Sequence, residues 1–147
     1  MKIFLVRLLL AGMGLLTGAC GMDEKIDVML ECLSPSGQKV ATLYRVSTGD
    51  RPGDQYMKIN IRPASDALDD GMHSFSFRHG YDAIIHWDSD HAMRIEYPEH
   101  SEITAQEQVV FGTSQTFSAS DPLKLTYQER PSTHGHFMVE QRCFNNR

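Results

Sequence analysis

The sequence predicts an all-β fold: an antiparallel sandwich or barrel of about nine short strands, stapled by one disulfide. Three observations predict it. From residue 26 onward, apolar and polar residues mostly alternate, which is the period of a strand. Turn residues interrupt this alternation about every ten residues, and no window has a convincing helical period. Two cysteines, Cys32 and Cys143, lie near the two ends of the alternating region.

The first part of this region predicts three strands separated by turns. The first turn is Ser34-Pro35-Ser36-Gly37, and a loop rich in Gly and Pro at 47–54 follows the second strand. Pro63 ends the third strand, and an acidic loop at 64–71 follows, with room for one helical turn. The residues that define the strands are Ile26, Val28, Leu30 and Cys32, which share one face, then Val40, Thr42, Tyr44 and Val46, then Met57, Ile59 and Ile61.

The clearest hairpin lies in the middle of the chain, around the turn Asp88-Ser89-Asp90. Asp and Ser side chains favour such a reversal because they hydrogen-bond nearby backbone groups. A short strand at 75–77 and a tight turn at 79–80 precede this hairpin. Its shared face comprises Tyr81, Ala83, Ile85 and Trp87 before the turn and Met93, Ile95 and Tyr97 after it. Weaker strands are expected at 109–111, at Leu123, Leu125 and Tyr127, and at Phe137, Val139 and Cys143.

The first nineteen residues have the layout of an export signal. Lys2 and Arg7 supply positive charge, and an apolar run of about nine residues follows at 8–16. A run of this length is too short to span a bilayer, because a spanning helix needs about 20 apolar residues. Residues 1–19 are therefore a targeting segment and are set aside from the fold.

The signal ends in the residues Leu16-Thr17-Gly18-Ala19-Cys20. This segment resembles the lipobox of bacterial prolipoproteins, in which small residues precede an invariant cysteine. It departs from the commonest form at Thr17, where Leu is usual. The resemblance implies cleavage before Cys20 and attachment of a diacylglycerol to its sulfur, with residues 20–25 as a tether to a single β domain at 26–147. Gly21 in place of Asp favours the outer membrane. The alternative is an ordinary secretory signal in which the cysteine stands by chance.

The cysteine count agrees with this interpretation. Three cysteines are odd for an exported chain, and acylation of Cys20 leaves Cys32 and Cys143 as an even pair in a compartment that permits disulfides. Their bond would close a loop of more than a hundred residues. Neither cysteine belongs to a C-x-x-C motif, so we expect a structural staple and not a redox centre.

The charge balance restricts the partners. The whole chain has a net charge of −5 with histidine neutral. Removal of the signal takes away two cations, Lys2 and Arg7, and no carboxylate, so the mature chain carries −7. Nucleic acid and anionic lipid surfaces both require a basic face, so a diffuse negative charge argues against them.

Two groups of residues have side chains that suit a divalent metal. His86, Asp88 and Asp90 lie around the predicted hairpin turn, where turn formation explains the two carboxylates better. His134 and His136 are two residues apart, which places both imidazoles on one side of a strand, although Gly135 suggests a loop. Further ligands would have to come through folding from His73, His79 or His100. We expect no metal and no cofactor other than the lipid on Cys20.

No catalytic motif stands out, because the chain lacks a G-x-S-x-G elbow and a Gly-rich phosphate loop. The order of the segments 34–37, 87–90 and 95–97 is similar to that of small bacterial exported or lipid-anchored β domains of uncharacterised function. That resemblance implies no catalytic residue.

The expected function is that of a lipid-anchored envelope lipoprotein that faces the periplasm and acts as a binding module, through a membrane anchor and an envelope protein partner. One alternative is an immunity or inhibitor lipoprotein directed against a toxin or wall hydrolase, where an acidic surface would steer a basic partner. The second alternative is a metal-dependent periplasmic enzyme that uses the histidines.

Overall fold

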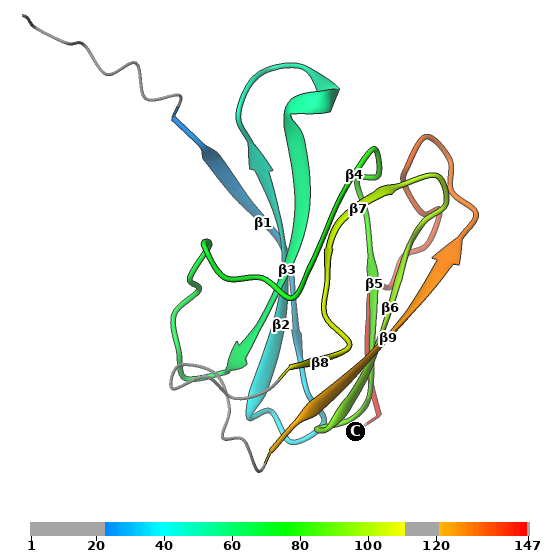
Figure 1. Ribbon diagram of the computed structural model, residues 1–147. Helices are drawn as coiled ribbons and strands as arrows, with labels where there is room; N and C mark the ends of the chain where they lie inside the picture. Colours follow the sequence, from blue (N-terminus) through cyan, green and yellow to red (C-terminus); the bar gives the residue numbers. More distant parts are fainter. Residues whose placement is uncertain (1–22, 111–120, 147) are drawn as a thin grey trace, which may run out of the picture.

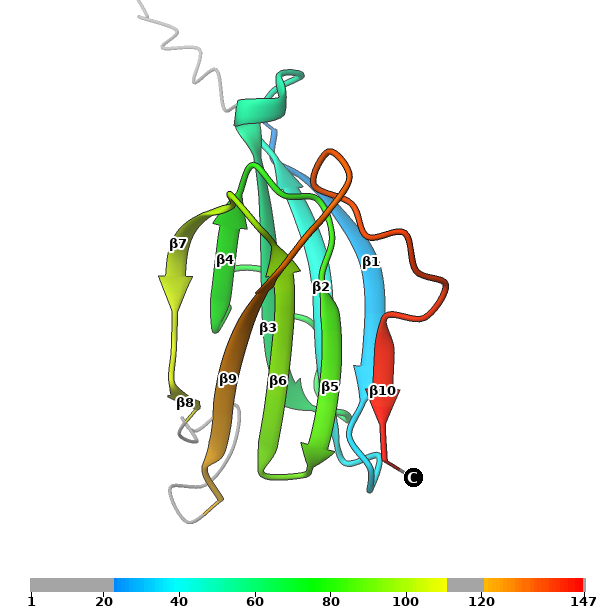
Figure 2. The same cartoon turned by 90° about the vertical axis from the view of Figure 1, so that its right-hand side faces the viewer.

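The chain folds into two five-stranded sheets packed face to face (Figures 1 and 2). The computed structural model describes residues 23–110 and 121–146. The first sheet has the order β1-β2-β3-β4-β7, with strands at Lys25–Leu33, Lys39–Ser47, Gln55–Pro63, Phe75–Arg78 and Glu102–Gln106. The second has the order β10-β5-β6-β9-β8, with strands at Cys143–Asn145, Ile84–Ser89, Ala92–Pro98, Leu123–Arg130 and Val109–Val110. The predicted all-β class and its single disulfide are confirmed.

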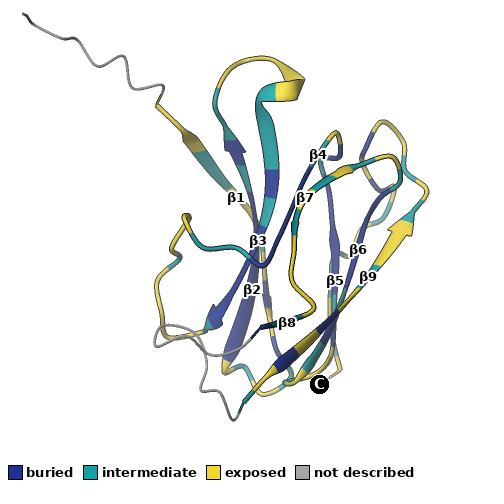
Figure 3. Cartoon of the chain, viewed as in Figure 1, coloured by how far each residue is buried: buried dark blue, intermediate teal, exposed yellow. Residues whose placement is uncertain are grey.

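The first sheet is antiparallel throughout, and its second strand β2 is buried on both faces (Figure 3). Ala41 and Leu43 face the core between the sheets. The alternate residues of β2 face outward, and the segment 64–74 covers one of them, Tyr44. The Tyr44 hydroxyl donates a hydrogen bond to the backbone oxygen of Asp70 at 2.9 Å, and this bond holds the segment over the outer face of the sheet.

The prediction that the apolar residues of the first strand share one face is wrong. A β-bulge between Val28 and Leu30 inserts one extra residue, Met29, into β1. Successive side chains of a strand point to opposite faces of the sheet. One extra residue therefore moves the side chains that precede it to the face opposite the one that the alternation predicts. Leu30 and Cys32 therefore pack towards the core, whereas Val28 lies outside with 54% of its surface exposed.

The second sheet is mixed. The predicted hairpin is confirmed as β5 and β6, but β6 pairs in parallel with β9, and β10 pairs in parallel with β5. The expectation of purely antiparallel pairing therefore holds for the first sheet alone. Tyr81 and Ala83 precede β5 instead of belonging to it, and Phe137 and Val139 lie in a loop before the short β10. Phe111 falls outside the described residues.

The core consists of large side chains from the inner faces of both sheets. Phe75 and Phe77 of β4 lie against Tyr97 of β6, with ring centroids 5.4 and 6.3 Å apart, and Trp87 and Met93 belong to the same buried cluster. The single helical element within residues 23–110 and 121–146 is a 3-10 turn at Pro52–Asp54. No helix in this part of the chain is long and apolar enough to cross a membrane.

Candidate functional site

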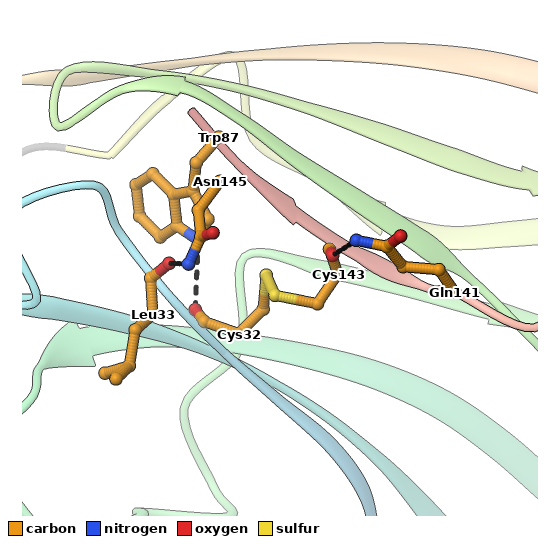
Figure 4. Close-up of a disulfide and its surroundings, with 6 residues drawn as sticks. All are labelled: Cys32, Leu33, Trp87, Gln141, Cys143 and Asn145. Atoms are coloured by element: carbon orange, nitrogen blue, oxygen red, sulfur yellow. Dashed lines mark hydrogen bonds between the residues drawn. A yellow bond between two sulfur atoms is a disulfide. The ribbon is translucent and has the colours of Figure 1, made fainter. Parts of the chain in front are cut away.

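The disulfide joins the edges of the two sheets (Figure 4). Cys32 lies on edge strand β1 and Cys143 on edge strand β10, with their Cα atoms 5.4 Å apart. The Trp87 indole donates a hydrogen bond to the Cys32 carbonyl at 3.0 Å, and the Asn145 amide donates to the Leu33 carbonyl at 3.1 Å. Cys32 is fully buried, so the bond is part of the core and has the staple role that the sequence predicts.

Cys20 and the signal at 1–19 lie outside the described residues, so cleavage and lipidation stay predictions. β1 begins at Lys25, one residue before the predicted start of the domain.

The candidate metal ligands around the hairpin have other partners. The His86 ring stacks on Phe144 with centroids 4.7 Å apart, and its Nε2 lies 3.1 Å from Glu96 Oε1. Burial lowers the pKa of His86 and outweighs the opposing effect of Glu96. Asp90 accepts a hydrogen bond from the Ser36 backbone at 3.1 Å, which joins the hairpin turn to the β1–β2 turn. Asp88 is exposed on β5.

The second histidine pair lies in the loop 131–142. His134 has a positive φ of 53°, and the His136 ring stacks on Tyr81 with centroids 5.4 Å apart. Across residues 23–110 and 121–146, no three His, Cys, Asp or Glu side chains are grouped so that they could hold a metal ion.

An ion pair between Asp82 and Arg142 fixes this loop. Arg142 Nε donates to both carboxylate oxygens of Asp82, at 2.8 and 3.0 Å. Asp82 also accepts the backbone N–H of Phe137 at 3.0 Å. The Arg142 guanidinium donates in turn to the backbone oxygens of Phe137 and Val139, at 3.2 and 3.0 Å. The backbone is therefore bound on both sides of residue 138.

Met138 lies between the two residues whose backbone oxygens Arg142 binds, and it is exposed to solvent. Its side chain is 85% exposed, whereas the preceding Phe137 is buried under the Arg130 guanidinium. An exposed apolar side chain on a pinned loop is suited to contact with another protein, because little conformational freedom is lost on binding. We call residues 131–142 the Met138 loop.

A groove of about 440 Å³ lies on the outer face of the first sheet. We call it the sheet groove. Its lining residues are Glu24, Val46, Thr48, Tyr56, Lys58, His73, Ser76 and Thr104. The volume falls in the range of small-molecule sites. The lining combines hydroxyl groups, the Tyr56 ring, the Val46 side chain, the Glu24 carboxylate and two basic side chains.

The basic side chains of the sheet groove are Lys58 and His73. Burial lowers the pKa of His73, and the charge of Lys58 lowers it further, whereas Glu107 opposes the shift. His73 Nδ1 is buried and has no hydrogen-bond partner among the residues that the structure describes. The imidazole therefore favours its neutral form and has one ring nitrogen unused.

Sequence reasoning missed both the sheet groove and the Asp82–Arg142 pair. Lys58 and Tyr56 alternate with buried residues of β3, which on the sequence alone indicates an ordinary solvated face. His73 was identified as a remote metal ligand only. Asp82 and Arg142 are 60 residues apart, and no local motif marks them.

Comparison with known proteins adds no relative. Scans against family models, curated proteins and solved structures each found no match.

Proposed function

We propose that this chain is a lipid-anchored envelope lipoprotein, a small binding module that faces the periplasm and is not an enzyme. The observation that carries the proposal is the disulfide between Cys32 and Cys143. Structural disulfides persist in oxidising compartments such as the bacterial periplasm. Because this bond uses both cysteines that follow the lipobox, Cys20 is the one thiol left for acylation.

The proposed mechanism depends on the lipid anchor and on the rigid β-sandwich. Each buried methylene contributes about 0.8 kcal/mol to membrane binding. Two acyl chains therefore anchor a protein stably, whereas a single chain binds only weakly and reversibly. Gly21 favours the outer membrane as the site of anchoring. The lipid concentrates the module at that surface, and the disulfide-stapled sandwich holds the sheet groove and the Met138 loop in fixed geometry.

Replacement of Cys20 tests the anchor. Cys20→Ala should abolish incorporation of a labelled fatty acid and move the protein from the membrane fraction to a soluble or unprocessed form. The measurement is metabolic labelling combined with membrane fractionation. Cys143→Ser, which removes a cysteine outside the lipobox, should keep its label. Membrane partition of Cys20→Ala at the level of the unaltered protein would sink the proposal.

The Met138 loop favours a second candidate, an inhibitor of a toxin or wall hydrolase. Inhibitory contacts rely on a few apolar anchors that enter a pocket of the partner. Met138 offers such an anchor, and the Asp82–Arg142 pair holds the backbone on both sides of it. The acidic mature chain would steer a basic enzyme towards it.

An inhibition assay with matched variants tests this candidate. The protein should slow the digestion of isolated peptidoglycan by a basic wall hydrolase, and Met138→Asp should weaken inhibition by about tenfold or more, because a hot-spot contact is lost. Val28→Asp, which changes another exposed apolar residue, should inhibit normally. Equal inhibition by Met138→Asp and the unaltered protein would exclude the loop as the inhibitory element.

A further inference from the structure

We infer that the sheet groove binds a phosphate group carried on a small organic molecule, with Lys58 as the fixed cation and His73 as a neighbouring basic group. This inference deepens the proposed binding role and rests on it for the source of the ligand. The groove's own residues carry the argument for its chemistry.

Lys58 supplies the fixed positive charge. It lies on β3 opposite Ser76 of β4, on the face of the sheet that points away from the core. Within the described residues, Lys58 makes no ion pair, although the chain carries more carboxylates than cations. A lysine with no salt bridge in a groove of an acidic protein is available to an anion, and charge-assisted hydrogen bonds to phosphate are stronger than neutral ones.

His73 adds a second basic group whose hydrogen bonding is incomplete. Its Nδ1 is buried without a partner in residues 23–110 and 121–146, and a buried polar atom left unpaired is unfavourable. Its pKa is held down by burial and by Lys58, with Glu107 as the opposing carboxylate. Glu24 lies among the lining residues as well. An anion beside Lys58 would offset the positive charge that, together with burial, disfavours protonation of His73.

The remaining lining residues indicate what the phosphate is attached to. Ser76 and Thr104 share one hydrogen bond at 2.5 Å, so one of their two hydroxyl protons is still available to an acceptor. A volume of about 440 Å³ exceeds what a phosphate ion alone would fill. The ring of Tyr56 and the side chain of Val46 provide an apolar surface for the organic part of the ligand.

The anchor proposed at Cys20 would bring membrane phosphates within reach. Glu24 follows Cys20 by four residues, and a chain of that length spans at most about 14 Å. A lipid headgroup and a soluble phosphoester present the same phosphate chemistry to the groove, so the test must separate them.

The test is a titration of the full-length protein, purified in a non-ionic detergent that adds no phosphate, and followed by nuclear magnetic resonance. Glycerol 3-phosphate, a headgroup fragment, and inorganic phosphate should both cause saturable shifts at Lys58, His73, Ser76 and Thr104. Uncharged glycerol should cause none. Glycerol 3-phosphate should bind more tightly than inorganic phosphate, because the inferred ligand has an organic part, and equal binding of the two overturns that part of the inference. Tighter binding of phosphatidylglycerol in the detergent micelle than of glycerol 3-phosphate indicates a lipid headgroup, and equal binding of those two indicates a soluble phosphoester. The bound anion should raise the pKa of His73, because linkage is reciprocal.

Variants locate the site. Lys58→Met should weaken binding about tenfold, the effect of losing a hydrogen bond to a charged group. His73→Gln serves the same purpose should Lys58→Met fail to fold. Lys124→Met, which removes an exposed lysine of the second sheet, should bind normally. Absence of saturable shifts, or equal losses from Lys58→Met and Lys124→Met, overturns the inference. Cys20→Ala should keep the titration unchanged, so failure of the anchor and failure of the groove are distinguishable.

Discussion

Replacing either Cys32 or Cys143 with serine should lower the free energy of unfolding by up to about 4 to 5 kcal/mol, because the bond closes a very long loop. The two cysteines are 111 residues apart. The bond also joins the two sheets at one edge, where β1 and β10 meet, whereas at the opposite edge the chain itself passes from β7 to β8. Loss of the bond would leave the first edge held only by contacts such as the Trp87 hydrogen bond to Cys32.

Urea unfolding of the single and double variants checks this expectation. The two single variants should lose similar stability, and the double variant should lose little more, because both changes remove the same interaction. Cys20→Ala, which lies outside the β domain, should unfold at the same urea concentration as the unaltered protein. Additive losses, or reactive thiols at Cys32 and Cys143 in the oxidised protein, would contradict the staple.

Arg142→Leu should lower the free energy of unfolding by about 3 kcal/mol or more, because removing one partner of a buried pair leaves an uncompensated charge. The Asp82 side chain is only 4% exposed and receives both of its charge-assisted bonds from Arg142 Nε. The same variant frees the backbone oxygens of Phe137 and Val139. Faster amide exchange across the Met138 loop should therefore accompany the loss of stability.

Two further variants make this expectation specific. Asp82→Asn should destabilise the fold as well, since it leaves the guanidinium without its carboxylate. Lys25→Ala, which breaks a pair between Lys25 and Asp27 on an exposed part of β1, should have no measurable effect. If Arg142→Leu were as stable as Lys25→Ala, the ion pair would not hold the loop.

Local patterns predicted the parts of the fold that depend on local chemistry. The alternation around Trp87 and the turn residues at 88–90 correctly indicated the β5–β6 hairpin, and the two cysteines of the domain correctly indicated the staple. Alternation failed where one residue is inserted, at the bulge before Leu30, and where a strand is covered on both sides, as β2 is by the core and the segment 64–74. The parallel pairs depend on how distant strands meet, which no local pattern records.

The functional surfaces were harder to predict for the same reason. The sheet groove brings together residues from β2, β3, β4 and β7 with His73, and each of them alone has the sequence pattern of an ordinary strand or loop residue. Asp82 gains its role only when Arg142 folds back against it. The sequence is most informative at its amino terminus, where the residues before Cys20 predict an export signal without any tertiary contact.

Mass spectrometry of the amino-terminal peptide of the protein recovered from membranes tests the central claim most directly. The proposal predicts a peptide that begins at Cys20 and carries a diacylglycerol on its sulfur. A peptide that extends upstream through Ala19, or one that begins at Cys20 with a free thiol, would contradict it.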